Sequence, residues 1–169
     1  ARGRARGGGA GDDEANPSKG GRATRGRIRR VGGGAVVGGL DAPVWMAIVP
    51  IANQMKVPFI GPWAAGTGIT RNGAADNYAF RVSAVDALVD EALVAYAVKT
   101  YGAKKPGMIL INNAWGESNQ KGLKDALQAA NLPAAGIEKY EANDVDMVPQ
   151  LSRLKEAGAD MLFLVGNVG

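Results

Sequence analysis

Apolar and polar residues follow one another in regular blocks along residues 35–169, in the manner of strands that alternate with helices. Short apolar runs closed by glycine, asparagine or proline predict buried strands, and longer stretches with apolar residues three and four apart predict helices. The predicted strands are residues 35–37, 56–60, 78–82, 108–111, 136–141 and 161–165, and the predicted helices are about 41–55, 85–101, 117–130 and 147–157. This alternation predicts an α/β fold with parallel sheets flanked by helices.

Capping residues mark several helix starts. Asp41 precedes Pro43, so it is expected to begin the first helix, with its side chain as the preferred cap. Ser83 followed by Asp86 resembles a capping box for the second helix. Asp146 is expected to cap the last helix.

The charge of the chain is divided unevenly. Residues 1–34 hold eight arginines and one lysine against three acidic residues, whereas residues 35–169 are net negative. The basic pI of about 9.5 therefore comes from this first segment, which has too few apolar side chains to bury a core. Three hypotheses stay open for it: a translation frame slip in GC-rich DNA, a flexible basic linker, or a nucleic-acid-binding arm that lacks the usual interleaved aromatics.

Residue types exclude several kinds of chemistry. The chain has no cysteine and no histidine, which removes disulfides, thiol chemistry and the commonest general base and metal ligand. No phosphate-binding glycine motif is complete, and no serine stands in a nucleophile motif. The adjacent acids at 12–14 are interpreted as a solvated turn. We therefore expect no enzyme activity, no cofactor and no metal, and no apolar run is long enough to span a membrane.

An ordered series of segments carries a family resemblance. VVGGLDAPVW, VPIANQMKVPFIGPWAAGT and YAFRVSAVDAL resemble the amino-terminal lobe of type I periplasmic binding proteins, and more closely the branched-chain amino-acid receptors of ABC importers. AWGESNQKGLKDAL and DMVPQLSRLKEAGADMLFLVGN are similar to the second lobe of that family. The resemblance implies a two-lobe fold, incomplete at both ends. Residues 35–83 would belong to the first lobe and 84–169 to the second, with 1–34 poorly ordered or misread.

The resemblance also implies a function. Such a protein captures a small solute reversibly in the cleft between its lobes and delivers it to an ABC permease, in the periplasm, although no secretory signal is visible. The implied solute is leucine or another branched-chain or apolar amino acid, or a related small carboxylate or amide, including an aromatic one. Arg81, Val82 and Ser83 would form the hinge. Alternatives are a ligand-sensing regulatory domain of the same fold, an α/β enzyme, and an RNA-binding protein that uses the arginine-rich arm.

The turn at Asp41 and Ala42 is the first candidate contact with the solute. The start of a helix offers free N–H groups and the positive end of the helix dipole to a carboxylate. Family members usually present a hydroxyl residue where this chain has Ala42, so only backbone donors remain here. Asp41 either caps the helix or meets an ammonium group of the ligand.

The loop after the second strand is the next candidate. Trp63 either packs beneath its own loop or forms a wall of the cleft. In the second case the backbone of Ala64 and Ala65 and the hydroxyl of Thr67 would be polar contacts.

The second lobe contributes two further candidates by resemblance. Trp115 occupies a position where the family often has an aromatic residue that closes over the ligand, and Asn167 would offer an amide at another such position. Trp45 is interpreted as core packing. Two indole faces from opposite lobes favour a ligand with an apolar or aromatic body and a polar head.

Overall fold

The computed structural model describes residues 34–38 and 41–166 of the 169-residue chain. The predictions for residues 1–33 and for Asn167 therefore lie outside the described residues. The elements, in chain order, are β1 (Val36–Val37), α2 (Ala42–Met55), β2 (Phe59–Gly61), the 3₁₀ turn η2 (Thr67–Ile69), β3 (Ala79–Arg81), α3 (Asp86–Tyr96), its π-helical extension η3 (Ala97–Tyr101), β4 (Gly107–Ile111), α4 (Ala114–Ala129), β5 (Ile137–Tyr140), α5 (Val148–Glu156) and β6 (Leu162–Val165). Among the described helices, none combines the length and the apolar character that crossing a bilayer requires.

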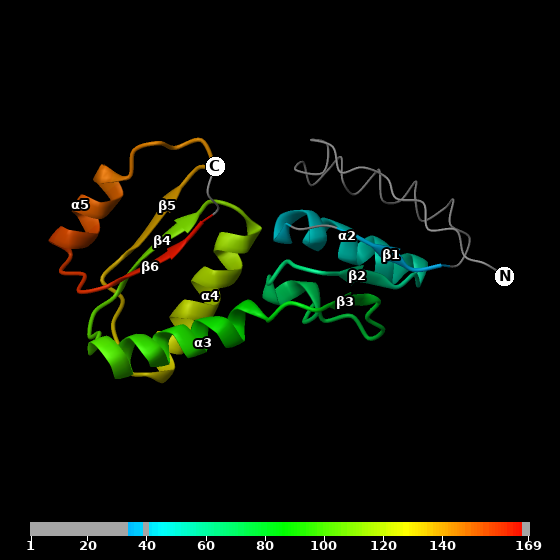
Figure 1. The fold of residues 1–169 in the computed structure, drawn as a ribbon, viewed down its shortest axis with the longest axis horizontal. Helices are drawn as coiled ribbons and strands as arrows, with labels where there is room; N and C mark the ends of the chain where they lie inside the picture. Colours follow the sequence, from blue (N-terminus) through cyan, green and yellow to red (C-terminus); the bar gives the residue numbers. More distant parts are fainter. Residues whose placement is uncertain (1–33, 39–40, 167–169) are drawn as a thin grey trace.

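The strands form two separate parallel sheets, ordered β1-β2-β3 and β5-β4-β6. Figure 1 shows the sheets side by side, with α4 facing the gap between them and α3 running beneath α4. We call β1–β3 with α2 the first unit and β4–β6 with α3, α4 and α5 the second unit. Each unit repeats a strand–helix–strand crossover, so the predicted parallel α/β fold is confirmed.

Each unit has its own apolar core. In the first unit, Trp45 on α2 is fully buried and meets Phe59 on β2 edge-to-face, with ring centroids 4.1 Å apart. The interpretation of Trp45 as core packing is confirmed. In the second unit, Met108 and Leu110 on β4 pack against Leu123 on α4. Strand β4 is buried along its whole length, as a central parallel strand requires. The prediction that the outer strands are buried is only partly correct, because Phe80 on β3 and Leu164 on β6 lie on exposed faces.

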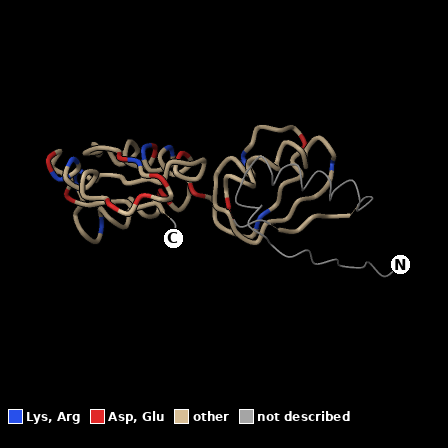
Figure 2. Tube along the Cα trace, turned by 90° about the horizontal axis from the view of Figure 1, so that it is seen from above, with Lys and Arg blue, Asp and Glu red and all other residues tan. Residues whose placement is uncertain are grey.

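Charged residues are distributed unequally between the first and the second unit. Figure 2 shows acidic and basic residues interspersed over the second unit and sparse on the first. In the part of the chain that the structure describes, they do not gather into a basic stripe of the kind that tracks a nucleic-acid backbone.

The predicted side-chain caps of α2 and α3 are wrong. Asp41 is the N-cap residue of α2, but its side chain makes no capping hydrogen bond. The N-cap of α3 is Val85, and Ser83 instead donates its hydroxyl to the carbonyl of Ala64, 3.2 Å away. The Ser83 hydroxyl therefore bonds to a carbonyl that is distant along the chain and does not cap α3.

The start of α4 also differs from the prediction. The helix begins at Ala114, three residues before the expected start, because the Asn113 side chain accepts hydrogen bonds from the N–H groups of Trp115 and Gly116 at 2.9 and 3.0 Å. The predicted cap of α5 is also wrong: the N-cap is Met147, which makes no side-chain capping bond, although the carboxylate of the preceding Asp146 accepts a hydrogen bond from the N–H of Val148 at 2.8 Å.

Helices α3 and α4 pack closely around a buried carboxylate. Asp90 on α3 is fully buried, and within the described residues neither of its carboxylate oxygens has a hydrogen-bond partner. Gly122 on α4 permits the approach, since a Cβ placed there would lie 2.0 Å from Asp90 Oδ2. Burial, and then the charge of Asp86 one turn earlier, raises the pKa of Asp90 to about 7.

We predict that this carboxyl makes stability depend on pH. The folded chain holds the proton of Asp90 more tightly than the unfolded chain, whose Asp90 has the ordinary pKa of 3.8. The contribution of Asp90 to the free energy of unfolding is therefore complete below pH 3.8 and is lost as the pH rises to about 7. The melting temperatures of Asp90→Asn and of the parent are measured by circular dichroism between pH 5 and 8. As the pH rises, the melting temperature of the variant should increase relative to that of the parent. A constant difference between the two would contradict this.

The close approach at Gly122 generates a second prediction. Alanine favours a helix over glycine by about 1 kcal/mol. The clash with Asp90 should nevertheless reverse this gain, so Gly122→Ala should lower the free energy of unfolding by about 1–3 kcal/mol. Urea unfolding measures the change, with Lys124→Ala on the exposed side of α4 as control. Combining the substitution with Asp90→Ala should recover most of the loss, and equal losses with and without Asp90 would rule the contact out.

Candidate functional site

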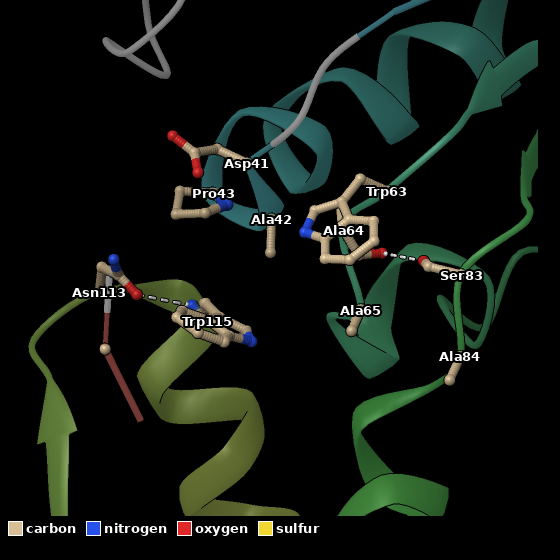
Figure 3. Close-up of a pocket in the computed structure, with 11 residues that line it drawn as sticks. Asp41, Ala42, Pro43, Trp63, Ala64, Ala65, Ser83, Ala84, Asn113 and Trp115 are labelled. Atoms are coloured by element: carbon tan, nitrogen blue, oxygen red, sulfur yellow. Dashed lines mark hydrogen bonds between the residues drawn. The ribbon is translucent and has the colours of Figure 1, made fainter. Parts of the chain in front are cut away.

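A pocket of about 770 Å³ lies between the two units. Figure 3 shows its residues arranged around a common space. They come from the segments that follow strands β1, β2, β3, β4 and β6, because parallel strands bring their carboxyl ends to one edge of a sheet. The lining residues are Asp41, Ala42, Pro43, Trp63, Ala64, Ala65, Ser83, Ala84, Asn113, Trp115 and Gly166.

Two indole rings line this pocket from opposite units. Trp63 follows β2 and is 68% exposed, so the hypothesis that it packs beneath its own loop is wrong. Trp115, in the first turn of α4, stands across the pocket from Trp63 in Figure 3. Its Nε1–H donates to Oδ1 of Asp86 at 3.3 Å, which fixes the edge of the ring. The pair provides broad apolar walls on both sides of one space.

A buried carboxylate stands behind the Trp115 ring. Asp86 is only 3% exposed, and its Oδ2 has no partner within the described residues. Burial raises the pKa of Asp86, and the hydrogen bond from the Trp115 indole works in the opposite direction. Asp86 does not line the pocket, and its side chain is connected to the site through the contact with Trp115.

The start of α2 supplies the polar end of the pocket. Among the described residues that line it, Asp41 alone carries a charge, and it is exposed at the rim. Beside it, the first N–H groups of α2 lack acceptors within the helix, except that Pro43 has no N–H to offer. This end can therefore accept a small polar group by backbone donation, while the charge of Asp41 favours a cationic or neutral neighbour.

Thr67 is not among the residues that line the pocket. Its N–H donates to the hydroxyl of Ser118 on α4 at 2.9 Å, and its own hydroxyl accepts from the N–H of Ala87 on α3 at 3.1 Å. The predicted contact of this hydroxyl with the ligand is replaced by a direct connection between the first unit and two helices of the second.

Six residues predicted from the sequence lie together at the pocket: Asp41, Ala42, Trp63, Ala64, Ala65 and Trp115. Sequence reasoning did not assign Pro43, Ala84, Asn113 or Gly166 to the site. Each of these follows a strand, so the carboxyl-end rule applied to every strand could have found them. Their roles toward a ligand, like those of the six, stay predictions.

The expected hinge lies between the two sheets. β3 ends at Arg81 and α3 begins at Asp86. Ser83 of this connection lines the pocket, whereas Val82 is 81% exposed. The movement attributed to these residues stays a prediction.

The described residues contain no group of three or more histidine, cysteine, aspartate or glutamate side chains placed to hold a metal ion. What the pocket does offer is two flat apolar walls, backbone polar groups and one carboxylate at the rim. This arrangement can hold a small molecule and orient its polar end.

The solved structures that resemble this chain include several binding proteins. The benzoate-bound solute-binding protein of an ABC transporter from R. palustris is 26% identical, with a TM-score of 0.81 over 94% of this chain and 43% of its own. An ABC transporter substrate-binding protein from Sphaerobacter thermophilus has 23% identity, a TM-score of 0.78, and coverage of 94% and 44%. A leucine binding protein from Thermotoga maritima has 19% identity, a TM-score of 0.77, and coverage of 92% and 43%.

The chain thus spans less than half the length of these structures. No curated protein sequence matches it. A family model described as "Periplasmic binding protein", a family of binding proteins rather than enzymes, matches residues 10–169. With the two parallel sheets and the pocket between them, this match establishes that the chain belongs to the periplasmic binding protein family.

Proposed function

We propose that the protein is the solute-binding component of an ABC importer, and that it captures its solute reversibly in the pocket between the two units. One observation carries the proposal: Trp63 and Trp115, from different units, line the same pocket of about 770 Å³. A pocket of this size suits a small organic molecule. Delivery to an ABC permease and a periplasmic location belong to the same proposal and are supported by the family.

The solute we infer has an apolar body, flat or branched, and one small polar head. The facing indoles favour a flat body by their area and quadrupole, and the start of α2 favours a carboxylate or amide head through its N–H groups. Aromatic acids and branched-chain amino acids both meet this description. They also match what the relatives' names record, benzoate for one and leucine for another. Asp41 at the rim suits the ammonium group of an amino acid.

Capture depends on a difference in affinity between two arrangements of the units. Hinge closure around a ligand is the motion known for periplasmic binding proteins. A ligand drives closure only by binding the closed arrangement better than the open one. Trp115 and Asn113 stand on the second unit and Trp63 on the first, so a ligand between them gains its full set of contacts only when the units approach.

Ligand binding to the whole chain tests the proposal directly. We expect benzoate or leucine to raise the melting temperature, since a ligand that binds only the folded form stabilises it. Isothermal titration calorimetry should then give one site, and the recovered ligand should be chemically unchanged. Chemical conversion of the probe would contradict a binding function. If neither benzoate, leucine nor a panel of small acids and amides binds, the proposed solute class is wrong.

Trp115 provides the sharpest variant. We predict that Trp115→Ala weakens binding of the active probe by about 1–3 kcal/mol, or about 5- to 150-fold, because a large apolar contact is lost. Tyr101→Ala is the matched control, since Tyr101 is an exposed aromatic residue outside the pocket. Calorimetry that returns the parent affinity for Trp115→Ala would place this indole outside the binding contacts.

A further inference from the structure

The loop that follows β2 and carries Trp63, which we call the pocket loop, contains a strained residue. Ala64 has a φ of 67°, in the left-handed region that residues with a side chain rarely adopt. It is 3% exposed and lines the pocket directly after Trp63. Strain of this kind persists only when surrounding contacts hold it, and it gathers at ligand-binding sites. The groups that hold Ala64 therefore determine the shape of this pocket wall.

The guanidinium group of Arg81 reaches across the loop. Its Nη1 donates to the carbonyl oxygens of Ala64 at 3.1 Å and Gly66 at 2.7 Å, and its Nη2 donates to the hydroxyl of Thr70 at 2.9 Å. Arg81 is the last residue of β3, where it pairs in register with Gly61 of β2. One planar, charged group on a sheet strand thus spans the loop from its strained residue to the end of η2.

The connection between the units contacts the same loop. Ser83 donates its hydroxyl to the Ala64 carbonyl that Arg81 also binds. Farther along, the N–H of Asp86 donates to the carbonyl of Ala65 at 2.8 Å. The loop that carries Trp63 is therefore hydrogen-bonded to the segment expected to act as the hinge.

We propose that Arg81 is a positioning residue for ligand capture: it maintains the left-handed turn at Ala64, and so keeps Trp63 and the backbone of Ala65 set for the ligand. This inference rests on the proposed function. Lysine cannot replace the arginine, because an ammonium group lacks the planar fork that reaches two carbonyls and a hydroxyl together. The role belongs to the loop and does not require Arg81 to touch the ligand, in keeping with its absence from the pocket lining.

A double-mutant cycle separates this role from a general loss of stability. Glycine adopts a left-handed turn without the steric penalty of alanine. Arg81→Gln should weaken binding of the active probe, benzoate or leucine, by about tenfold or more in the Ala64 background, as expected for loss of charged hydrogen bonds. With Ala64→Gly present, at least half of that loss on a logarithmic scale should disappear. Equal losses in the two backgrounds would overturn the proposal.

A readout that needs no ligand completes the test. With 5-fluorotryptophan in the chain, the ¹⁹F resonance of Trp63, assigned through Trp63→Phe, should shift or broaden in Arg81→Gln, while that of the buried Trp45 stays in place. Arg71→Gln is the matched control, an exposed arginine that makes the same change of charge. An unmoved Trp63 resonance overturns the positioning role, even if neither probe binds and the proposed function itself fails. Should Arg81→Gln not fold, Arg81→Lys takes its place, with the same outcomes.

Discussion

Parallel strand pairing is the constraint on which the site depends. In both sheets every observed pair is parallel, so all strands of a unit present their carboxyl ends at one edge. The residues that line the pocket follow five of the six strands in the described part of the chain. An antiparallel arrangement would send half of these segments to the opposite edge. The pocket is thus a consequence of strand direction before any particular side chain is considered.

The geometry of the pocket loop depends on two opposing energies: the backbone strain at Ala64 and the hydrogen bonds that its carbonyl accepts. A residue with a side chain in the left-handed region costs about 1–2 kcal/mol. A hydrogen bond from a charged donor contributes about 1.5–3 kcal/mol. The carbonyl of Ala64 accepts from both Arg81 and Ser83, so the contacts that hold the turn outweigh its strain. The loop is preorganised at the position that presents Trp63.

Behind the opposite wall, the second unit combines close packing with buried acids. Gly122 allows α4 to approach α3, and Asp90 fills the contact with a carboxyl group that is best tolerated uncharged. One turn away, Asp86 accepts the hydrogen bond from the Trp115 indole. The Trp115 wall is therefore anchored to a helix pair whose stability is sensitive to proton binding, while the Trp63 wall depends on the arginine fork.

Much of this protein follows from the sequence by itself. Short apolar runs and helical periodicity are enough to predict the strands, the helices and the parallel α/β class, because burial of one face or stripe follows local spacing. The position after a strand also points to Trp63 as a pocket residue, and the family resemblance points to Trp115. Only the tertiary structure decided the sheet orders, the partners of Ser83 and Thr67, the missing cap at Asp41 and the contact of Asp90 with Gly122. These depend on groups that are distant along the chain and meet only once the crossovers have packed, so no local pattern encodes them.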